Sequence, residues 1–326
     1  MRTRSLFNRN QGGRAMSENL FKLFVTQFSQ LLHLKLQQMQ SKLRGRCMEG
    51  YHEGKQASPI QYIGAIQMKA PAGKYAPLER QDADFSRRWV FPVDKEASQM
   101  IDTFDKLKLL SDPTAQYSSV AAAAVAREWD DRLIQAAFST AQIGQDAGGL
   151  TSEVFNTGST TTGAGFQIAS TFGSSAASGL TVAKMIEAKR AFRKLQVDVD
   201  METMTWITNS QGESDLLNQV QVVSTEFSDR PTLQDGKVTR FMGFDIIYSE
   251  RLTSTSNVRQ NIVFVRSGIY LGIWRDTYND VSQRKDLSSL PYQLYTAMSS
   301  GATRLEAGRL LQALCADTSA AADVTP

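Results

Sequence analysis

The sequence predicts an α+β fold in which an extended segment leads directly into one long helix. Residues 55–95 are interrupted by four prolines and two glycines, so no helix of useful length fits there. Residues 113–140 carry apolar side chains at helical spacing, and after residue 181 helical patterns alternate with strand-like runs. Because an extended segment buries little on its own, we expect this chain to complete its packing against copies of itself.

The N-terminal region is predicted to contain a helix and carries an excess of positive charge. Apolar residues recur at helical spacing from Ser17 to Leu43, and this narrow, glutamine-rich stripe favours a partner helix or another subunit over a membrane surface. Residues 1–58 hold ten Lys and Arg against three Asp and Glu, whereas the whole chain has a net charge of +3. This charge suits nucleic acid or an acidic protein surface. Residues 1–15 equally fit a solvated tail, or an extension upstream of a start at Met16.

The extended segment contains two strand-like pieces, Gln61 to Ala70 and Arg87 to Phe91. Apolar residues alternate in part along the first piece, which predicts a two-stranded arm. About forty residues without a helix are unusual inside a compact domain. The segment is therefore predicted to be a functional loop or to pack on a neighbour.

The long helix is predicted to follow a short irregular element from Val93 to Leu110. Ser111-Asp112-Pro113 places a capping Asp before a proline at the first helical position. The helix is predicted to continue to Thr140 and to stop at Gly144. Residues 144–181 then hold eight of the 22 glycines of the chain, which predicts a low-complexity connector and a domain boundary.

The remainder of the chain predicts a mixed α/β unit. A helix from Thr181 to Leu195 should turn Met185, Ile186 and Phe192 inward and most of its basic residues, Lys184 included, outward. The other expected elements are a buried strand at 204–208, a short helix at 210–220, strands at 237–248, 261–265 and 269–274, and a final strand pair, 292–298 and 303–314, across Ser299-Ser300-Gly301. The tail from residue 316 to 326 is predicted to be disordered.

No catalytic, cofactor or metal site is predicted. The two histidines lack the setting of a Ser-His-Asp or Cys-His site, and no complete phosphate-binding loop is present. Asp198, Asp200 and Glu202 alternate like the start of a calcium loop, but its glycine and final glutamate are missing. The two cysteines lie far apart in the sequence and form no CxxC motif, so no disulfide framework is predicted. Two reduced thiols fit a cytoplasmic protein. No apolar run approaches the roughly 20 residues needed to cross a bilayer.

The order of these parts resembles that of tailed-phage major capsid proteins. Residues 127–137, REWDDRLIQAA, resemble the end of the spine helix of that family. Residues 240–249, RFMGFDIIYS, resemble the strand that enters its axial domain, and residues 301–306, GATRLE, the late strand that returns to its peripheral domain. The stretches 17–58, 70–77 and 87–92 look like one branch of the family. The resemblance covers nearly all of residues 16–314.

The resemblance implies a Hong Kong 97-type capsid fold with an N-terminal arm, an extended loop, a peripheral domain that carries the long spine helix, and an axial domain. The expected divisions are the arm at 1–54, the extended loop at 55–95, the peripheral domain at 96–180 and 296–326, and the axial domain at 181–295. The implied function is that of a major capsid protein, and not of an enzyme: self-assembly into the icosahedral head shell that encloses phage double-stranded DNA.

Three other functions stay open from the sequence. The nearest is an encapsulin-like shell protein of a cellular nanocompartment, which shares the fold and encloses cargo enzymes. An α/β hydrolase or transferase would need a site built without histidine. A monomeric nucleic-acid-binding protein would show salt-sensitive binding without any assembly.

The implied partners are other copies of the chain in hexamers and pentamers, a scaffolding protein, the portal, packaged double-stranded DNA and a cement protein, with no membrane and no cofactor. The implied location is the virion, after assembly in the host cytoplasm. Three groups of residues are expected at contacts between subunits: Phe21, Phe28 and Leu32 in the arm helix, Tyr62, Ile66 and Met68 in the extended loop, and Arg87, Arg88 and Trp89 in its return strand. For each group the alternative is local core within its own subunit.

Overall fold

The computed structural model describes residues 36–64, 66, 68–70, 73, 80, 82–83, 85–102, 114–145, 149–163, 165–219 and 238–317. Within them the fold is mixed α and β, as the sequence predicts, and contains three β-sheets. The following predictions lie outside the described residues: the part of the N-terminal helix before residue 36, with Phe21, Phe28 and Leu32, the helix cap at Ser111-Asp112-Pro113, and the tail beyond residue 317.

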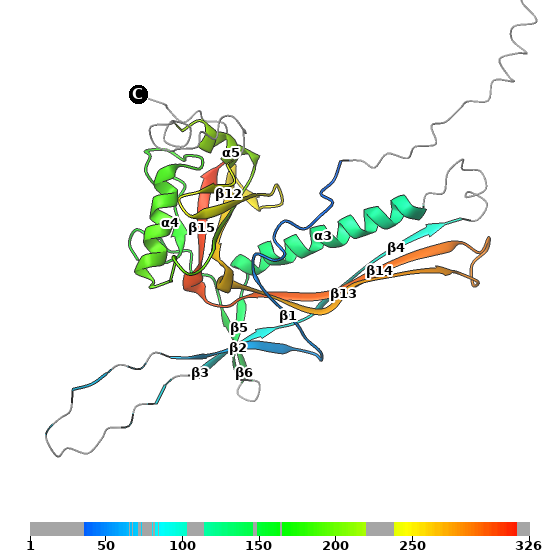
Figure 1. The fold of residues 1–326 in the computed structure, drawn as a ribbon, viewed down its shortest axis with the longest axis horizontal. Helices are drawn as coiled ribbons and strands as arrows, with labels where there is room; N and C mark the ends of the chain where they lie inside the picture. Colours follow the sequence, from blue (N-terminus) through cyan, green and yellow to red (C-terminus); the bar gives the residue numbers. More distant parts are fainter. Residues whose placement is uncertain are drawn as a thin grey trace, which may run out of the picture.

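An elongated limb consists of one long helix lying along a four-stranded sheet (Figure 1). The helix, α3 (Thr114–Phe138), confirms the predicted long helix. The sheet has the order β1 (Met48–Tyr51), β13 (Ile269–Gln283), β14 (Tyr292–Arg304) and β4 (Val93–Ile101), with β1 parallel to β13 and the other pairs antiparallel. Trp129 and Leu133 of α3 are buried in one cluster with Leu271 and Ile273 of β13, so apolar burial holds the helix on the sheet.

A compact half is built on a seven-stranded sheet with two helices (Figure 1). Its strands are, in spatial order, β7 (Gln167–Ile168), β15 (Leu310–Ala316), β12 (Val258–Val265), β8 (Met204–Thr208), β10 (Phe244–Tyr248) and β9 (Arg240–Phe241), with β11 (Ser254–Thr255) paired to β12. Helices α4 (Val182–Lys194) and α5 (Ser210–Leu217) begin after the capping side chains of Thr181 and Asn209. The buried strand and both helices are thereby confirmed.

The third sheet lies where the limb meets the compact half (Figure 1). Its order is β2 (Ala57–Ile63), β3 (Phe85–Val90), β5 (Ala141–Gln145) and β6 (Gly149–Glu153), all antiparallel. The antiparallel pairing of β2 with β3 confirms that the two pieces pair, but the first strand is Ala57–Ile63 rather than Gln61 to Ala70. The extended loop as a separate unit stays a prediction. Strand β5 of this sheet directly follows α3 in the chain, so the loop starts from a sheet that is joined to the long helix.

Two segments before α3 differ from the prediction. Val93 to Ile101 is a regular strand, β4, although it was expected to be irregular; most of its side chains are exposed, and pairing with β14 rather than an apolar period defines it. Residues 36–43 are not helical. The backbone N–H groups of Lys42 and Leu43 donate to the Asp130 carboxylate of α3 instead of to carbonyls of their own segment.

The expected stop of the long helix at Gly144, and the connector after it, are also wrong. The helix ends at Phe138, and Gly144 belongs to strand β5. Residues 149–168 contain β6 and β7, and place Phe155 and Ile168 in the interior. Glycine and serine enrichment here reflects tight turns between short strands rather than a linker.

The turn between the two expected final strands was placed wrongly. Ser299-Ser300-Gly301 lies inside the single strand β14 (Tyr292–Arg304), and the chain turns after it at the 3-10 turn η3 (Ala307–Arg309). A Cβ on Gly301 would stand 2.2 Å from the carbonyl oxygen of Phe91. The glycine permits close approach of two chain segments and does not mark a turn.

The helix α4 buries a different face from the one expected. Met185 and Phe192 are buried, as expected, whereas Ile186 is 52% exposed and Lys184 is completely buried. The Lys184 ammonium donates to the carbonyl oxygens of Ser178 (2.7 Å), Gly179 (2.9 Å) and Leu314 (3.0 Å). Three carbonyl acceptors make a buried ammonium tolerable, which periodicity alone does not reveal.

The strands group into sheets in a way that does not follow the expected domain boundaries. Strand β15 was assigned to the peripheral domain but pairs with β12 in the seven-stranded sheet, whereas β13 was assigned to the axial domain but belongs to the limb. The named subdomains stay a prediction.

Candidate inter-subunit surfaces

The root of the extended loop is fixed inside its own chain. Arg88 and Trp89 on β3 are 9% and 8% exposed. The Arg88 guanidinium pairs with the Glu153 carboxylate of β6, and the indole N–H of Trp89 donates to the carbonyl oxygen of Gly144 on β5 at 2.8 Å. A buried cation with a hydrogen-bonded carboxylate holds the return strand in one place.

Beyond this root, the loop exposes large apolar side chains. Ile63, Ile66, Met68 and Phe85 have exposed fractions of 66%, 62%, 101% and 69%. A row of exposed apolar groups on a projecting segment is typical of a surface that another protein covers. The cationic Arg87 is exposed beside them.

Tyr62 differs from its neighbours in the loop. It is partly buried against the cluster of Val90, Tyr270 and Leu305 in its own chain, and this burial raises the pKa of its phenol. The structure thus brings Tyr62, Arg88 and Trp89 to the loop root and leaves Ile66 and Met68 on the projecting part. Contact of any of these residues with a neighbour stays a prediction.

Arg304, which the sequence did not single out, lies at the junction between limb and loop. Its side chain is completely buried, and its guanidinium donates to the carbonyl oxygens of Ala137 (3.2 Å), Ser139 (3.0 Å) and Glu153 (3.1 Å). Burial lowers the pKa of this guanidinium. A cation at the carboxyl end of α3 also faces the negative end of the helix dipole. The sequence signal was a single arginine after the small residues 299–303 of β14.

Three basic residues at the end of the N-terminal arm are bound within the chain. The Arg44 guanidinium donates to the Asp276 carboxylate at 2.9 and 3.3 Å and lies over the ring of Trp129; this hydrogen bonding lowers the pKa of Asp276. Arg46 pairs with Asp245 at 2.7 Å, and the Lys42 ammonium donates to the carbonyl oxygen of Tyr248. The charges of Arg44 and Arg46, which the sequence analysis counted as available to an anionic partner, are therefore already paired with carboxylates.

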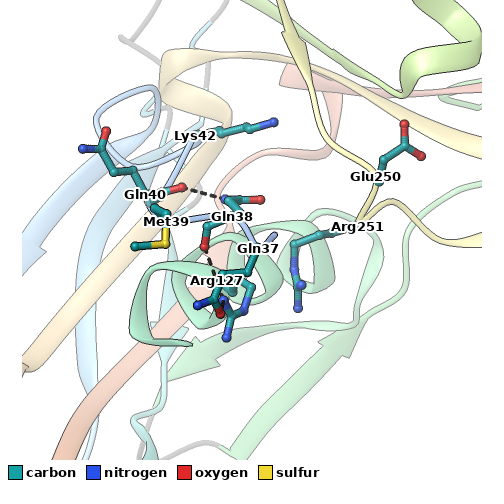
Figure 2. A pocket seen from close by; sticks show the side chains of 9 residues that line it. Gln37, Gln38, Met39, Gln40, Lys42, Arg127, Glu250 and Arg251 are labelled. Carbon is teal, nitrogen blue, oxygen red and sulfur yellow. Dashed lines mark hydrogen bonds between the residues drawn. The ribbon is translucent and has the colours of Figure 1, made fainter. Parts of the chain in front are cut away.

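An open cleft of about 750 Å³ lies beside the same segment (Figure 2). It is bordered by residues 37–42, by Arg127 of α3 and by Glu250 and Arg251 of the compact half. Figure 2 shows amide and charged side chains around it. The cleft is an open seam between the arm and the body, and it lacks the enclosure typical of a small-molecule site.

The polar core of the compact half also escaped the sequence analysis. Burial lowers the pKa of Lys184 and raises that of the nearby Asp215, which accepts hydrogen bonds from Leu180 N and Gln211. Burial likewise raises the pKa of the Cys315 thiol to about 11 and that of Cys47 to about 12. Both thiols therefore stay protonated near neutral pH and are poor nucleophiles.

Across the described part of the chain, no three His, Cys, Asp or Glu side chains converge as metal ligands would. In the same residues, no helix is long and apolar enough to span a membrane.

The fold is that of proteins that build phage capsids. The cyanophage P-SCSP1u capsid protein matches with a TM-score of 0.70, 14% identity and coverage of 96% of this chain and 97% of the other. A chain of the cyanophage Pam1 capsid matches with a TM-score of 0.68 and 10% identity, and the match covers 96% of this chain and 100% of the other. A chain of Mycobacterium phage Che8 gives 0.66, 14% identity, and coverage of 89% and 96%. A comparison with curated protein sequences finds no significant match.

The sequence itself identifies the family. The family described as phage capsid protein matches residues 21–317, so this chain belongs to it. The chain is a major capsid protein that assembles with copies of itself into capsomers of an icosahedral head shell, and its location is the virion. The family is structural, as the sequence analysis expected.

Proposed function

We propose that subunits join into hexamers and pentamers through the extended loop, whose exposed apolar side chains are covered by a neighbouring copy. The observation that carries this proposal is the exposure of Ile63, Ile66, Met68 and Phe85 on a projecting segment in a protein of a self-assembling family. Covering such side chains stabilises each contact by about 25 cal/mol for every Å² of apolar surface removed from water. Many repeated contacts then make a closed shell stable.

The shell encloses double-stranded DNA, and the N-terminal arm faces inward in this proposal. With Lys42, Arg44 and Arg46 bound to the body, residues 1–35 still hold six Lys and Arg against one Glu. That charge is available to phosphates, or to an acidic scaffolding protein before packaging. Assembly takes place in the host cytoplasm, with the portal at one vertex and a cement protein as an additional partner on the shell.

The test compares the wild-type chain with Met68→Asp and Met201→Asp, which places the same charge on another exposed methionine outside the loop. Sedimentation velocity and negative-stain electron microscopy report assembly, and circular dichroism reports folding. We expect Met68→Asp to remain folded and to lose rings and shells, since a buried carboxylate opposes the contact. Met201→Asp should assemble like the wild type.

Full assembly of Met68→Asp would contradict the proposed loop contact. Particles purified from infected cells are treated with nuclease, and DNA that survives the treatment is enclosed in the shell. Shells that hold a protein cargo and no protected DNA would instead favour a cellular compartment.

A further inference from the structure

The carboxylate of Asp130 gathers the end of the N-terminal arm onto α3. Asp130 is completely buried in the middle of the helix. It accepts hydrogen bonds from the Gln38 side-chain amide, from Ser41 Oγ at 2.6 Å, and from the backbone N–H groups of Lys42 at 3.1 Å and Leu43 at 3.2 Å. All of these donors belong to one short stretch of the arm.

Arg127, one turn earlier on the same helix, binds the acceptors of that stretch. Its guanidinium donates to the side-chain oxygen of Gln37 at 2.8 Å and to the carbonyl oxygen of Gln38 at 3.3 Å, as Figure 2 shows. The helix thus presents an acceptor group and a donor group three residues apart on one face. Together they match the polarity of residues 37–43.

Few other interactions fix this part of the arm. Leu36, Met39, Gln40 and Lys42 are exposed, and apolar burial begins only at Leu43. Apart from the bond of the Lys42 ammonium to the carbonyl oxygen of Tyr248, the course of the chain before Leu43 therefore depends on polar contacts with α3. Hydrogen bonds to a charged group are stronger than neutral ones, and leaving two backbone N–H groups unpaired in the interior is costly.

Asp131, the adjacent carboxylate, has a different partner. It pairs with Arg251 in the compact half, with Nε 2.5 Å from its oxygen. Neighbouring helix positions point in different directions. Asp131 therefore ties the helix to the compact half rather than to the described residues of the arm, which provides a matched control for Asp130.

We propose that Asp130, assisted by Arg127, is the latch that sets where the N-terminal arm leaves the body of the subunit. It is a positioning residue: it makes no contact with a partner and acts by holding residues 37–43. The course of residues 37–43 then follows from the orientation of α3. A subunit without the latch keeps its fold and its loop contacts but releases the chain as far as Leu43.

Limited trypsin digestion of the full-length protein tests this latch in the wild type, Asp130→Ala and Asp131→Ala. Alanine is the best helix former, so neither change weakens α3 by itself. Mass spectrometry follows cleavage after Lys42 and Arg44, and thermal unfolding follows the body. We expect Asp130→Ala to speed cleavage after Lys42 about tenfold or more, with a smaller change after Arg44, which Asp276 still holds. Asp131→Ala should leave both cleavages within about twofold of the wild type.

Equal cleavage in the two variants would overturn the proposal. If Asp130→Ala does not fold, the arm side of the latch is removed instead with Gln38→Ala and Ser41→Ala, which leave the helix untouched. Faster cleavage of that double variant with an unchanged unfolding midpoint supports the latch, and unchanged cleavage rejects it. The loop contact and the latch are tested separately. If Met68→Asp fails to assemble but its arm is cleaved no faster than that of the wild type, the result concerns the loop contact and agrees with the latch.

Discussion

The compact half and the extended loop treat apolar side chains in opposite ways. In the compact half, Trp206, Phe244 and Phe192 have no exposed surface, and Trp206 meets the edge of the Phe244 ring with centroids 5.5 Å apart. In the extended loop, Ile66 and Met68 are 62% and 101% exposed. One region finishes its packing within one subunit, and the other leaves it unfinished.

This difference separates folding from assembly. The compact half and the limb can supply the stability of a single subunit, because their cores are closed. The loop adds little to that stability but offers the surface that a second copy can bury. Changes in the two regions should therefore appear in different measurements, and three substitutions test that separation.

Trp206→Ala should have the largest effect on the subunit. Removing a fully buried Trp from the seven-stranded sheet leaves a cavity and should lower the free energy of unfolding by about 3–5 kcal/mol. Urea denaturation of the unassembled subunit measures the loss. Trp206→Phe is the control, since the indole N–H has no hydrogen-bond partner within the described structure; a loss below about 1 kcal/mol in Trp206→Ala would show that this core is not closed.

Alkaline pH should destabilise the compact half by an intermediate amount. The Cys315 thiol has a pKa of about 11 when folded and 9.0 as its ordinary value. The stability that this thiol contributes is complete below pH 9 and is lost as pH rises toward 11, because only the unfolded thiol ionises there. The loss at pH 10 should be about 1.4 kcal/mol.

Cys315→Ala isolates this effect, since the burial-lowered pKa of Lys184 acts in the opposite direction. Urea denaturation at pH 8 and pH 10 should show a smaller fall in stability for Cys315→Ala than for the wild type. An identical fall in both proteins would mean that the thiol ionises freely in the folded state and is not sealed from water.

Ile66→Thr should have the smallest effect on the subunit. An exposed side chain contributes little to folding, so the unfolding free energy should change by less than about 0.5 kcal/mol. Sedimentation of the same protein should nevertheless show weaker assembly. A subunit that loses several kcal/mol on this change would place Ile66 in an internal core and remove the contrast between the two regions.

The sequence predicted the elements with strong local periodicity. The long helix, the strand at 204–208 and the helix after Thr181 carry their own pattern of buried residues, and each is found. Strand β4 was missed because its polar side chains follow no period and its partner, β14, lies almost 200 residues away in the chain. Gly301 was misinterpreted because close approach to Phe91 cannot be read from neighbouring residues.

The functional residues also divide into those that local sequence predicts and those that depend on distant partners. Ile66 and Met68 were expected on an exposed loop from their position among prolines and glycines, whereas Ile63 and Phe85 were not singled out. Asp130, Arg304 and Lys184 were not, since each is a buried polar group whose partners come from distant segments. For Asp130 a signal did exist: it lies beside Trp129 and shares a helix face with Leu133 and Ile134, where a lone carboxylate needs partners.

The ladder of the limb has a mechanical consequence. Strands β13, β14 and β4 follow its length alongside α3 (Figure 1), and the hydrogen bonds between antiparallel strands run perpendicular to them. A pull along the limb therefore acts on all of these bonds together in shear, whereas a sideways pull opens them one after another. The limb tolerates stretching far better than peeling, and a shell that aligns its limbs with the direction of tension gains strength without any added contact.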